Sequence, residues 1–177
     1  FTPENKTIAV GTKQNPERES LFDRGQPLSD EKSDTFLFFD GFLANADDLR
    51  ITLENKGHNF LSNNGAEAII HLYQEEGTES FAKLNGEFIF VLFDNFNRTL
   101  YLVRDKVGTR PLYYTSLFEK KDLFIFTNQM GALLESGTIT KNLNEEGLYH
   151  YFTFGAAPRP FTVIKGINKI PGGNFIE

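Results

Sequence analysis

Hydrophobic positions in the first half of the chain recur at helical spacing. Ala66, Ile69, Ile70 and Tyr73 fall at i, i+3, i+4 and i+7, which predicts an amphipathic helix that runs to about Glu76. One side of this helix is apolar, so it should pack against the interior of the protein.

A shorter helix is expected just before it. Asn45 can cap the start of this helix, Leu49 and Leu53 would form its apolar face, and Gly57 would end it. The β-rich run at residues 35–39 predicts a strand that precedes the helix.

The second half of the chain is dominated by runs that predict strands. Residues 88–93 are apolar at both alternating positions, so this strand should be covered on both faces. Turn-forming residues follow, and residues 99–103 return as its hairpin partner. Further strands are expected at residues 7–11, 112–116 and 123–127, and short helices near residues 130–134 and 144–151. Antiparallel strand pairs with helices in separate blocks predict an α+β fold of packed sheets covered by helices.

Composition narrows the class of protein. The 177 residues suit one domain, residues 1–177, and 19 Phe without any Trp indicate a thick apolar interior. A net charge of −6 with scattered basic residues argues against a nucleic-acid partner. We expect no membrane contact and a cytoplasmic location, because no apolar run approaches membrane-spanning length and no signal-peptide pattern is present. The chain has no Cys and its three His are isolated, so no metal site is expected.

Three motifs carry a resemblance to a known family. They are LNGEFIF at 84–90, LVRDKVGTRPLYY at 102–114, and YFTFGAAPRP at 151–160 followed by KGINKIPGG at 165–173. In this order and at this spacing they resemble the glutamine-hydrolysing domain of asparagine synthetases, an N-terminal-nucleophile (Ntn) amidotransferase. The resemblance runs from about Lys6 to Glu177 and implies a four-layer αββα sandwich of two antiparallel sheets.

The resemblance also implies a chemistry, in which the thiolate of a Cys at the first residue attacks the side-chain amide of glutamine. The sequence contains no Cys, and Phe1 has no nucleophilic atom, so we assign no catalytic residue. Thr2 could act as the nucleophile only if Phe1 were removed, and the residues after Thr2 fit a later strand of the family.

Three pocket positions depart from the family pattern. The Asn-Gly-Glu motif that stabilises the oxyanion aligns with Asp40, Gly41 and Phe42. Asp40 places a carboxylate where developing negative charge needs a hydrogen-bond donor, and Phe42 removes a carboxylate that binds the substrate. The family's Ser-Asp pair aligns with Asn64 and Gly65, so the carboxylate that meets the glutamine ammonium is also absent.

Two other segments could belong to the pocket. The Arg that binds the glutamine carboxylate could be Arg18 or Lys13, and a solvated loop charge is an equally good interpretation of either. Residues 85–87 spell Asn-Gly-Glu, but they precede the buried strand at residues 88–93. We interpret them as a turn that matches the motif by coincidence.

These substitutions predict a degenerate, non-catalytic glutamine amidotransferase-like domain of an asparagine-synthetase-like, ATP-dependent, amide-forming protein. Its expected partner is an ATP-dependent synthetase domain in cis or in trans, and a homodimer is left open. No cofactor is expected in this chain, because it contains no Ser-Gly-Gly-x-Asp-Ser loop and ATP and Mg belong to the synthetase domain. Two alternatives stay open: the glutaminase of a true glutamine-hydrolysing asparagine synthetase whose Cys segment is missing here, and a stand-alone binding module.

Overall fold

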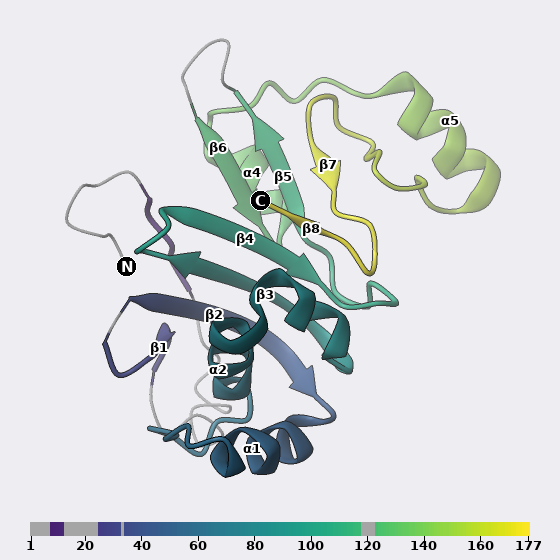
Figure 1. Cartoon of the computed structure of the whole chain (residues 1–177). Coiled ribbons are helices and arrows are strands. Elements are labelled where there is room, and N and C mark those ends of the chain that lie inside the picture. The colour runs from purple at the N-terminus through teal and green to yellow at the C-terminus, as the bar shows by residue number, and fades with distance from the viewer. Residues whose placement is uncertain (1–7, 13–24, 33, 118–122) are drawn as a thin grey trace. The chain divides into compact units, whose positions relative to one another are not determined.

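A computed structural model describes residues 8–12, 25–32, 34–117 and 123–177 of the chain (Figure 1). These residues form two compact units. The first unit reaches Val103 and includes Glu177, and the second unit runs from Arg104 to Ile176. The prediction of a single domain over residues 1–177 stays a prediction.

The first unit is built on an antiparallel sheet. Its strands lie in the order β1-β2-β3-β4, with bounds β1 Leu28–Ser29, β2 Thr35–Leu43, β3 Gly86–Asp94 and β4 Thr99–Arg104. The two long strands β2 and β3 pair over their whole length, so that Phe39 lies opposite Phe90. The helices α1 (Ala46–Asn55) and α2 (Glu67–Glu76) lie between β2 and β3 in the chain, and a 3-10 helix, η2 (Gly77–Lys83), follows α2.

The core of this unit lies between the sheet and α2. Alternate residues of β2 and β3 face the helix, as the two-residue period of a strand requires, and Figure 1 shows α2 lying across these strands. The side chains that form this core include Leu37, Phe39 and Leu43 of β2, Phe88, Phe90 and Leu92 of β3, and Ile69, Ile70 and Leu72 of α2. The intervening residues Ile89, Val91 and Phe93 are also buried, which confirms that β3 is covered on both faces.

The predicted helices of this unit are confirmed, with one change at the start of α1. The side chain of Asn45 caps no amide of α1. Its Nδ2 donates instead to the Lys83 carbonyl at 3.0 Å, and its Oδ1 accepts from the Asn85 amide at 3.0 Å. Asn45 therefore ties the start of α1 to the segment that leads into β3. The strand predicted at residues 7–11 is wrong where it is described: residues 8–11 form no strand, because an apolar run becomes a strand only where a partner pairs with it.

The second unit contains a three-stranded antiparallel sheet in the order β6-β5-β7. Its elements are β5 Tyr113–Ser116, β6 Phe124–Thr127, α4 Met130–Glu135, α5 Glu145–Phe154, β7 Asn168–Lys169 and β8 Phe175–Ile176. A separate small core forms around Leu133 of α4 and Ile167, with Ile139 and Ile164 beside them. The predicted short helices are confirmed, and α5 runs three residues further than the predicted end at residue 151.

Arg104 ties two of the three family motifs together. Its guanidinium is buried and donates to three backbone carbonyls: from Nε to Arg110 at 2.5 Å, from Nη1 to Ile170 at 2.5 Å, and from Nη2 to Gly108 at 2.6 Å. Ile170 belongs to the closing motif, so one side chain fixes that motif against the 102–114 hairpin corner. A planar, permanently charged group with several donors suits this position.

Asp105 also stabilises this hairpin corner, through hydrogen bonds to the residues that follow it. Its carboxylate accepts from the amides of Val107, Gly108 and Thr109 and from the Thr109 hydroxyl. Burial raises the pKa of Asp105, but the bonds from Thr109, Gly108 and Val107 outweigh burial and lower it overall. Arg104 and Asp105 both bond to backbone groups of this corner, and both are scaffold.

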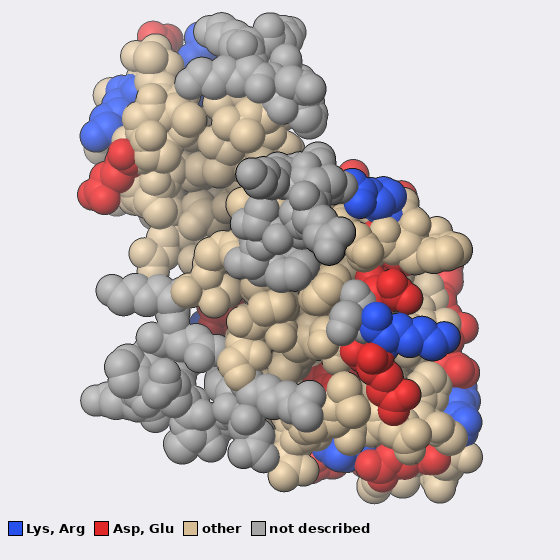
Figure 2. All heavy atoms as spheres, turned by 90° about the vertical axis from the view of Figure 1, so that its left-hand side faces the viewer, with Lys and Arg blue, Asp and Glu red and all other residues tan. Residues whose placement is uncertain are grey.

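Charged side chains are mixed in sign on the face shown in Figure 2, where Lys and Arg lie among Asp and Glu over the described residues. This mixture, with the net charge of −6, gives no basic stripe of the kind that tracks nucleic acid on that face. Among the described residues, no helix combines the length and the apolar character needed to cross a membrane.

Candidate functional site

The three residues aligned with the oxyanion motif lie in the second half of β2. Asp40, Gly41 and Phe42 pair with the beginning of β3, where Gly41 lies opposite Phe88 and Phe42 opposite Glu87. Gly41 has φ of 143°, and a Cβ there would lie 2.1 Å from the Glu87 carbonyl oxygen. Only glycine fits this close approach of two strands.

Asp40 and Phe42 point to the same face of the sheet, because they are two residues apart on one strand. This is the face opposite the one that Phe39 and Leu43 turn toward the core. Asp40 is half-buried, while the Phe42 side chain is 68 % exposed. An exposed Phe in this position supplies neither charge nor a hydrogen bond to a polar substrate.

On β3, the residue opposite Phe42 is Glu87, which carries a carboxylate. It lies directly opposite Phe42 and is exposed, and opposite residues on paired strands project from the same face. Sequence reasoning assigned residues 85–87 to a turn, and this is wrong for two of them. Gly86 and Glu87 already belong to β3, because they pair with Leu43 and Phe42 of β2. Gly86 has φ of 152°, which favours glycine, and a Cβ there would lie 2.2 Å from the Phe42 carbonyl oxygen.

Gly65 lies in the short loop before α2. A Cβ built on Gly65 would lie 2.6 Å from the Cβ of Ala46, the first residue of α1. The loop therefore packs against the segment that follows β2. An aspartate here, as in the family pattern, would require Ala46 or the loop to move.

We predict that Gly65→Ala lowers the free energy of unfolding by about 1–3 kcal/mol, the usual cost of inserting atoms into a packed contact. Gly131→Ala serves as the matched control, because no atom lies within 4 Å of the added Cβ and the position is helical. This control should be neutral or stabilising by up to about 1 kcal/mol. Urea unfolding of both variants checks the contact, and an equal effect of the two substitutions would disprove it.

The other residues that the sequence analysis named for the pocket lie in segments that the structure does not describe. Arg18 and Lys13, the two candidates for binding the glutamine carboxylate, fall outside the described residues, as do Phe1 and Thr2. Those predictions stay predictions. The structure thus brings Asp40, Gly41 and Phe42 together in β2 and places Gly65 beside the start of α1.

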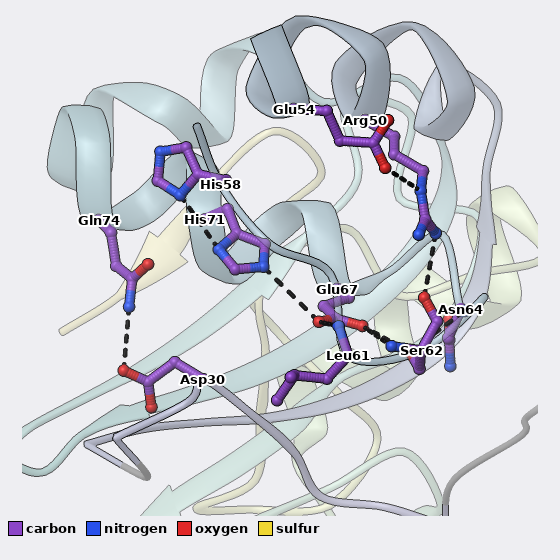
Figure 3. Close-up of polar contacts among 10 residues, drawn as sticks. All are labelled: Asp30, Arg50, Glu54, His58, Leu61, Ser62, Asn64, Glu67, His71 and Gln74. Carbon is purple, nitrogen blue, oxygen red and sulfur yellow. Dashed lines mark hydrogen bonds and ion pairs between the residues drawn. The ribbon is translucent and has the colours of Figure 1, made fainter. Parts of the chain in front are cut away.

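Sequence reasoning missed a buried acidic group next to this loop, shown in Figure 3. Glu67 is only 2 % exposed. Its carboxylate accepts from the Leu61 amide at 2.5 Å, the Ser62 amide at 2.8 Å and the Ser62 hydroxyl at 2.5 Å. Burial raises the pKa of Glu67, but the bonds from His71, Ser62 and Leu61 outweigh burial and lower it overall. Glu67 is thus an anion that holds the loop in front of Gly65.

The network continues away from the loop through two histidines. His71 Nε2 lies 3.6 Å from Glu67, and the Nδ1 atoms of His71 and His58 face each other at 3.2 Å. His58 Nε2 lies 3.0 Å from Glu75, which also pairs with Lys56 at 3.0 Å. In the contact between the rings one Nδ1 donates and the other accepts, and a carboxylate faces the outer nitrogen of each ring. A signal for this network exists in the sequence, because Glu67 and His71 are spaced i, i+4 on α2.

Polar side chains of the loop complete its fixed shape. The Asn64 Oδ1 accepts from the Ala66 amide at 3.0 Å, and the Ser62 hydroxyl accepts from the Asn64 amide at 3.2 Å. The Nδ2 of Asn64 is buried without a hydrogen-bond partner among the described residues. Arg50 donates to the Ser62 carbonyl at 3.0 Å and thereby links α1 to the loop. These contacts position the loop.

The described residues also contain no group of three or more His, Cys, Asp or Glu side chains arranged to hold a metal ion. Around β2 and the loop, the described side chains offer carboxylate, amide, hydroxyl and imidazole groups and an exposed aromatic ring.

The family described as "Glutamine amidotransferase domain" matches residues 17–177. The chain belongs to this family. An asparagine synthetase [glutamine-hydrolyzing] 1 of Bacillus subtilis (strain 168) is 32 % identical over 152 residues, which cover 85 % of this chain and 23 % of the relative. Asparagine synthetase [glutamine-hydrolyzing] 3 of the same organism is 32 % identical over 141 residues, covering 78 % and 22 %. The matched region thus spans less than a quarter of each relative.

Solved structures confirm the predicted fold of this amidotransferase domain. A glutamine phosphoribosylpyrophosphate amidotransferase of B. subtilis, complexed with ADP and GMP, matches at a TM-score of 0.53 and 24 % identity, covering 63 % of this chain and 26 % of that one. A structure described as the allosteric regulatory enzyme of purine biosynthesis matches at a TM-score of 0.56 and 20 % identity, covering 85 % and 28 %. The domain therefore has the α+β fold of the Ntn amidotransferases, with two antiparallel sheets and helices.

Proposed function

We propose that this glutamine amidotransferase domain does not hydrolyse glutamine and is the glutaminase-like part of an ATP-dependent, amide-forming protein of the asparagine synthetase kind. The observation that carries the proposal is Phe42, whose side chain is 68 % exposed where the family pattern has a substrate-binding Glu. It supports loss of function because glutamine presents charged and amide groups that an aromatic ring cannot bind with comparable strength.

Two further positions support the same conclusion independently. Asp40 would direct a carboxylate toward an oxyanion, and losing one oxyanion donor alone typically lowers the rate by about 10²–10³. Gly65 carries no carboxylate for the glutamine ammonium, and its contact with Ala46 leaves no space for one without rearrangement. These arguments use only positions within the matched region and are independent of what precedes Phe1.

A second candidate is a functional glutaminase, and Glu87 is the observation that favours it. Its exposed carboxylate faces the same side of the sheet as Phe42 and Asp40, so it could replace the carboxylate lost at Phe42. The curated relatives are named as glutamine-hydrolysing enzymes, which also favours this candidate. It requires a Cys nucleophile outside these 177 residues, because the chain itself has none.

Glutamate release from glutamine distinguishes the two candidates. We expect the full-length protein, with ATP and Mg, to release pyrophosphate when its carboxylate substrate and an amine or ammonium are supplied. We expect no glutamate above background when glutamine is supplied. Glutamine-dependent glutamate release would overturn the proposal, and its loss in Glu87→Gln but not in Glu31→Gln would then support the second candidate. Glu31 is an exposed acid outside β2 and β3, so it is a suitable control.

Further parts of the proposal concern partners and location. ATP and Mg would bind a synthetase domain in cis or in trans, and not this domain. We also propose a cytoplasmic location, which suits an ATP-dependent reaction and a chain without cysteine.

A further inference from the structure

Three cationic side chains converge in the second unit, beside the hairpin corner: Arg104, Arg159 and Lys169. The guanidinium carbon of Arg104 and an Nη atom of Arg159 both lie 3.0 Å from the position that a Cβ on Gly108 would take, so the two guanidinium groups are neighbours. Arg104 also donates to the carbonyl of Ile170, the residue after Lys169. Like charges at such short range repel one another, so this arrangement favours an anion.

Lys169 lies in β7, between β5 and the segment that carries Arg159. It pairs with Tyr113 of β5, and its backbone amide donates to the Pro160 carbonyl at 2.8 Å. The ammonium of Lys169 lies 5.6 Å from the centre of the Tyr113 ring. Burial lowers the pKa of Lys169, and the charges of Arg104 and Arg159 lower it further. The three cations therefore act on one another.

The described residues offer these cations little negative charge. Asp105 lies beside Arg104, but its oxygens already accept from three backbone amides and one hydroxyl. Among the described residues, Arg159 forms no ion pair, and the ammonium of Lys169 forms neither a hydrogen bond nor an ion pair. Three cations thus face a single carboxylate, and two positive charges remain. A ligand with two negative charges would balance them.

The cluster is accessible to a ligand on one side. Arg104 is 5 % exposed, Lys169 is half-buried and Arg159 is exposed. Arg159 uses Nη2 to donate to the Val107 carbonyl at 3.2 Å, which leaves most of its N–H groups available. An anion could therefore bond to Arg159 and Lys169 directly. Arg104 would act through its charge, since its guanidinium already donates to three carbonyls.

We propose that Arg159 and Lys169, supported by the charge of Arg104, form a binding site for a phosphate group, either as free inorganic phosphate or as a phosphate ester. A phosphate monoester carries a charge of about −1.5 to −2 near neutral pH, which matches the charge left uncompensated here. Guanidinium groups and ammonium groups are the usual protein donors to phosphate oxygens. The site uses none of the pocket residues in β2 or in the loop before α2, so it is independent of the proposed function.

Titration calorimetry of the full-length protein with inorganic phosphate tests this site, with the ionic strength held constant by sodium chloride so that screening does not vary. Lys169→Gln should weaken phosphate binding at this site by roughly tenfold or more, because it removes a charge-assisted bond from a partly buried position. Lys165→Gln is the matched control, since Lys165 is an exposed lysine of the same unit. It should leave phosphate binding unchanged.

A second variant keeps the test decisive if Lys169→Gln fails to fold. Arg159→Gln alters an exposed side chain and should also weaken phosphate binding by roughly tenfold. Equal affinity in the wild type and in these variants would overturn the proposal, as would an equal loss in Lys165→Gln. Acetate that binds as tightly as phosphate would also overturn it, because the site would then not require a dianion.

Glycerol phosphate distinguishes the two sources of the phosphate group. Tighter binding of glycerol phosphate than of inorganic phosphate would assign the site to a phosphate ester, and the reverse would assign it to free phosphate. Neither titration involves glutamine, so this test and the glutamate assay can fail separately.

Discussion

Phe90→Ala should lower the free energy of unfolding by about 3–5 kcal/mol, the usual cost of truncating a large aromatic side chain in a core. Phe90 is 1 % exposed in β3. Its ring meets Phe81 edge-on at 5.4 Å between centroids and lies 5.8 Å from the ring of Phe88. Removing it leaves a cavity between the sheet and α2, and it removes two aromatic contacts that contribute beyond buried area.

Phe96→Ala provides the matched control for this prediction. Phe96 is the same residue type, but it is 83 % exposed. Its truncation should change the free energy of unfolding by no more than about 0.5 kcal/mol. Urea unfolding monitored by circular dichroism measures both variants, and a loss below about 1 kcal/mol for Phe90→Ala would show that β3 is not buried as described.

Glu67→Gln should cost about 1–3 kcal/mol at neutral pH, the usual penalty for leaving a buried hydrogen-bonding group without its partner. The carboxylate of Glu67 accepts three hydrogen bonds from Leu61 and Ser62 and faces His71 at 3.6 Å. An amide of the same size keeps one acceptor oxygen and turns its NH₂ group toward groups that are themselves donors. Buried donors are then left unpaired.

The same variant should lose part of the acid sensitivity of the fold. The pKa of Glu67 is lowered in the folded state from its ordinary value of 4.5. Its contribution to stability is therefore fully present above about pH 4.5, and it is lost as the pH falls through the lower folded pKa. The difference in stability between the wild type and Glu67→Gln should shrink over this interval.

Glu54→Gln is the control for Glu67→Gln. Glu54 pairs with the Arg50 guanidinium at 2.9 Å, but its side chain is 48 % exposed. Exposed pairs contribute about 0–1 kcal/mol, so this variant should stay close to the wild type at every pH. Urea unfolding at pH 7 and at two or three values below pH 5 measures all three proteins. A Glu67→Gln curve parallel to the wild type across this range would show that Glu67 carries no buried charge.

The Glu67 network bears on the proposal that this domain does not hydrolyse glutamine. Glu67, Ser62 and Asn64 hold the loop before α2 in a fixed shape, although Gly65 offers no carboxylate to a substrate. A loop held in a fixed shape beside Gly65 fits the proposal that this domain is retained for its structure.

The sequence predicted the elements that depend on local pattern. Spacing at i, i+3, i+4 and i+7 located α2, and a run apolar at both alternating positions located β3 and its burial on both faces. The sequence analysis assigned the Asn-Gly-Glu triplet at residues 85–87 to a turn, because three residues alone do not show which strand they pair with. Pairing with β2 decides that Gly86 and Glu87 are strand residues.

By itself the sequence determined the family and the α+β class, since these depend on residue identity and order, and it predicted which residues align with the pocket motifs of the family. Only the tertiary structure decided that Glu67 is a buried anion, that Glu87 lies beside Phe42, and that Arg104 and Arg159 are neighbours. Burial and hydrogen bonding depend on residues far apart in the chain. The free energy of a charge or an aromatic ring is set by those neighbours and not by the residue alone.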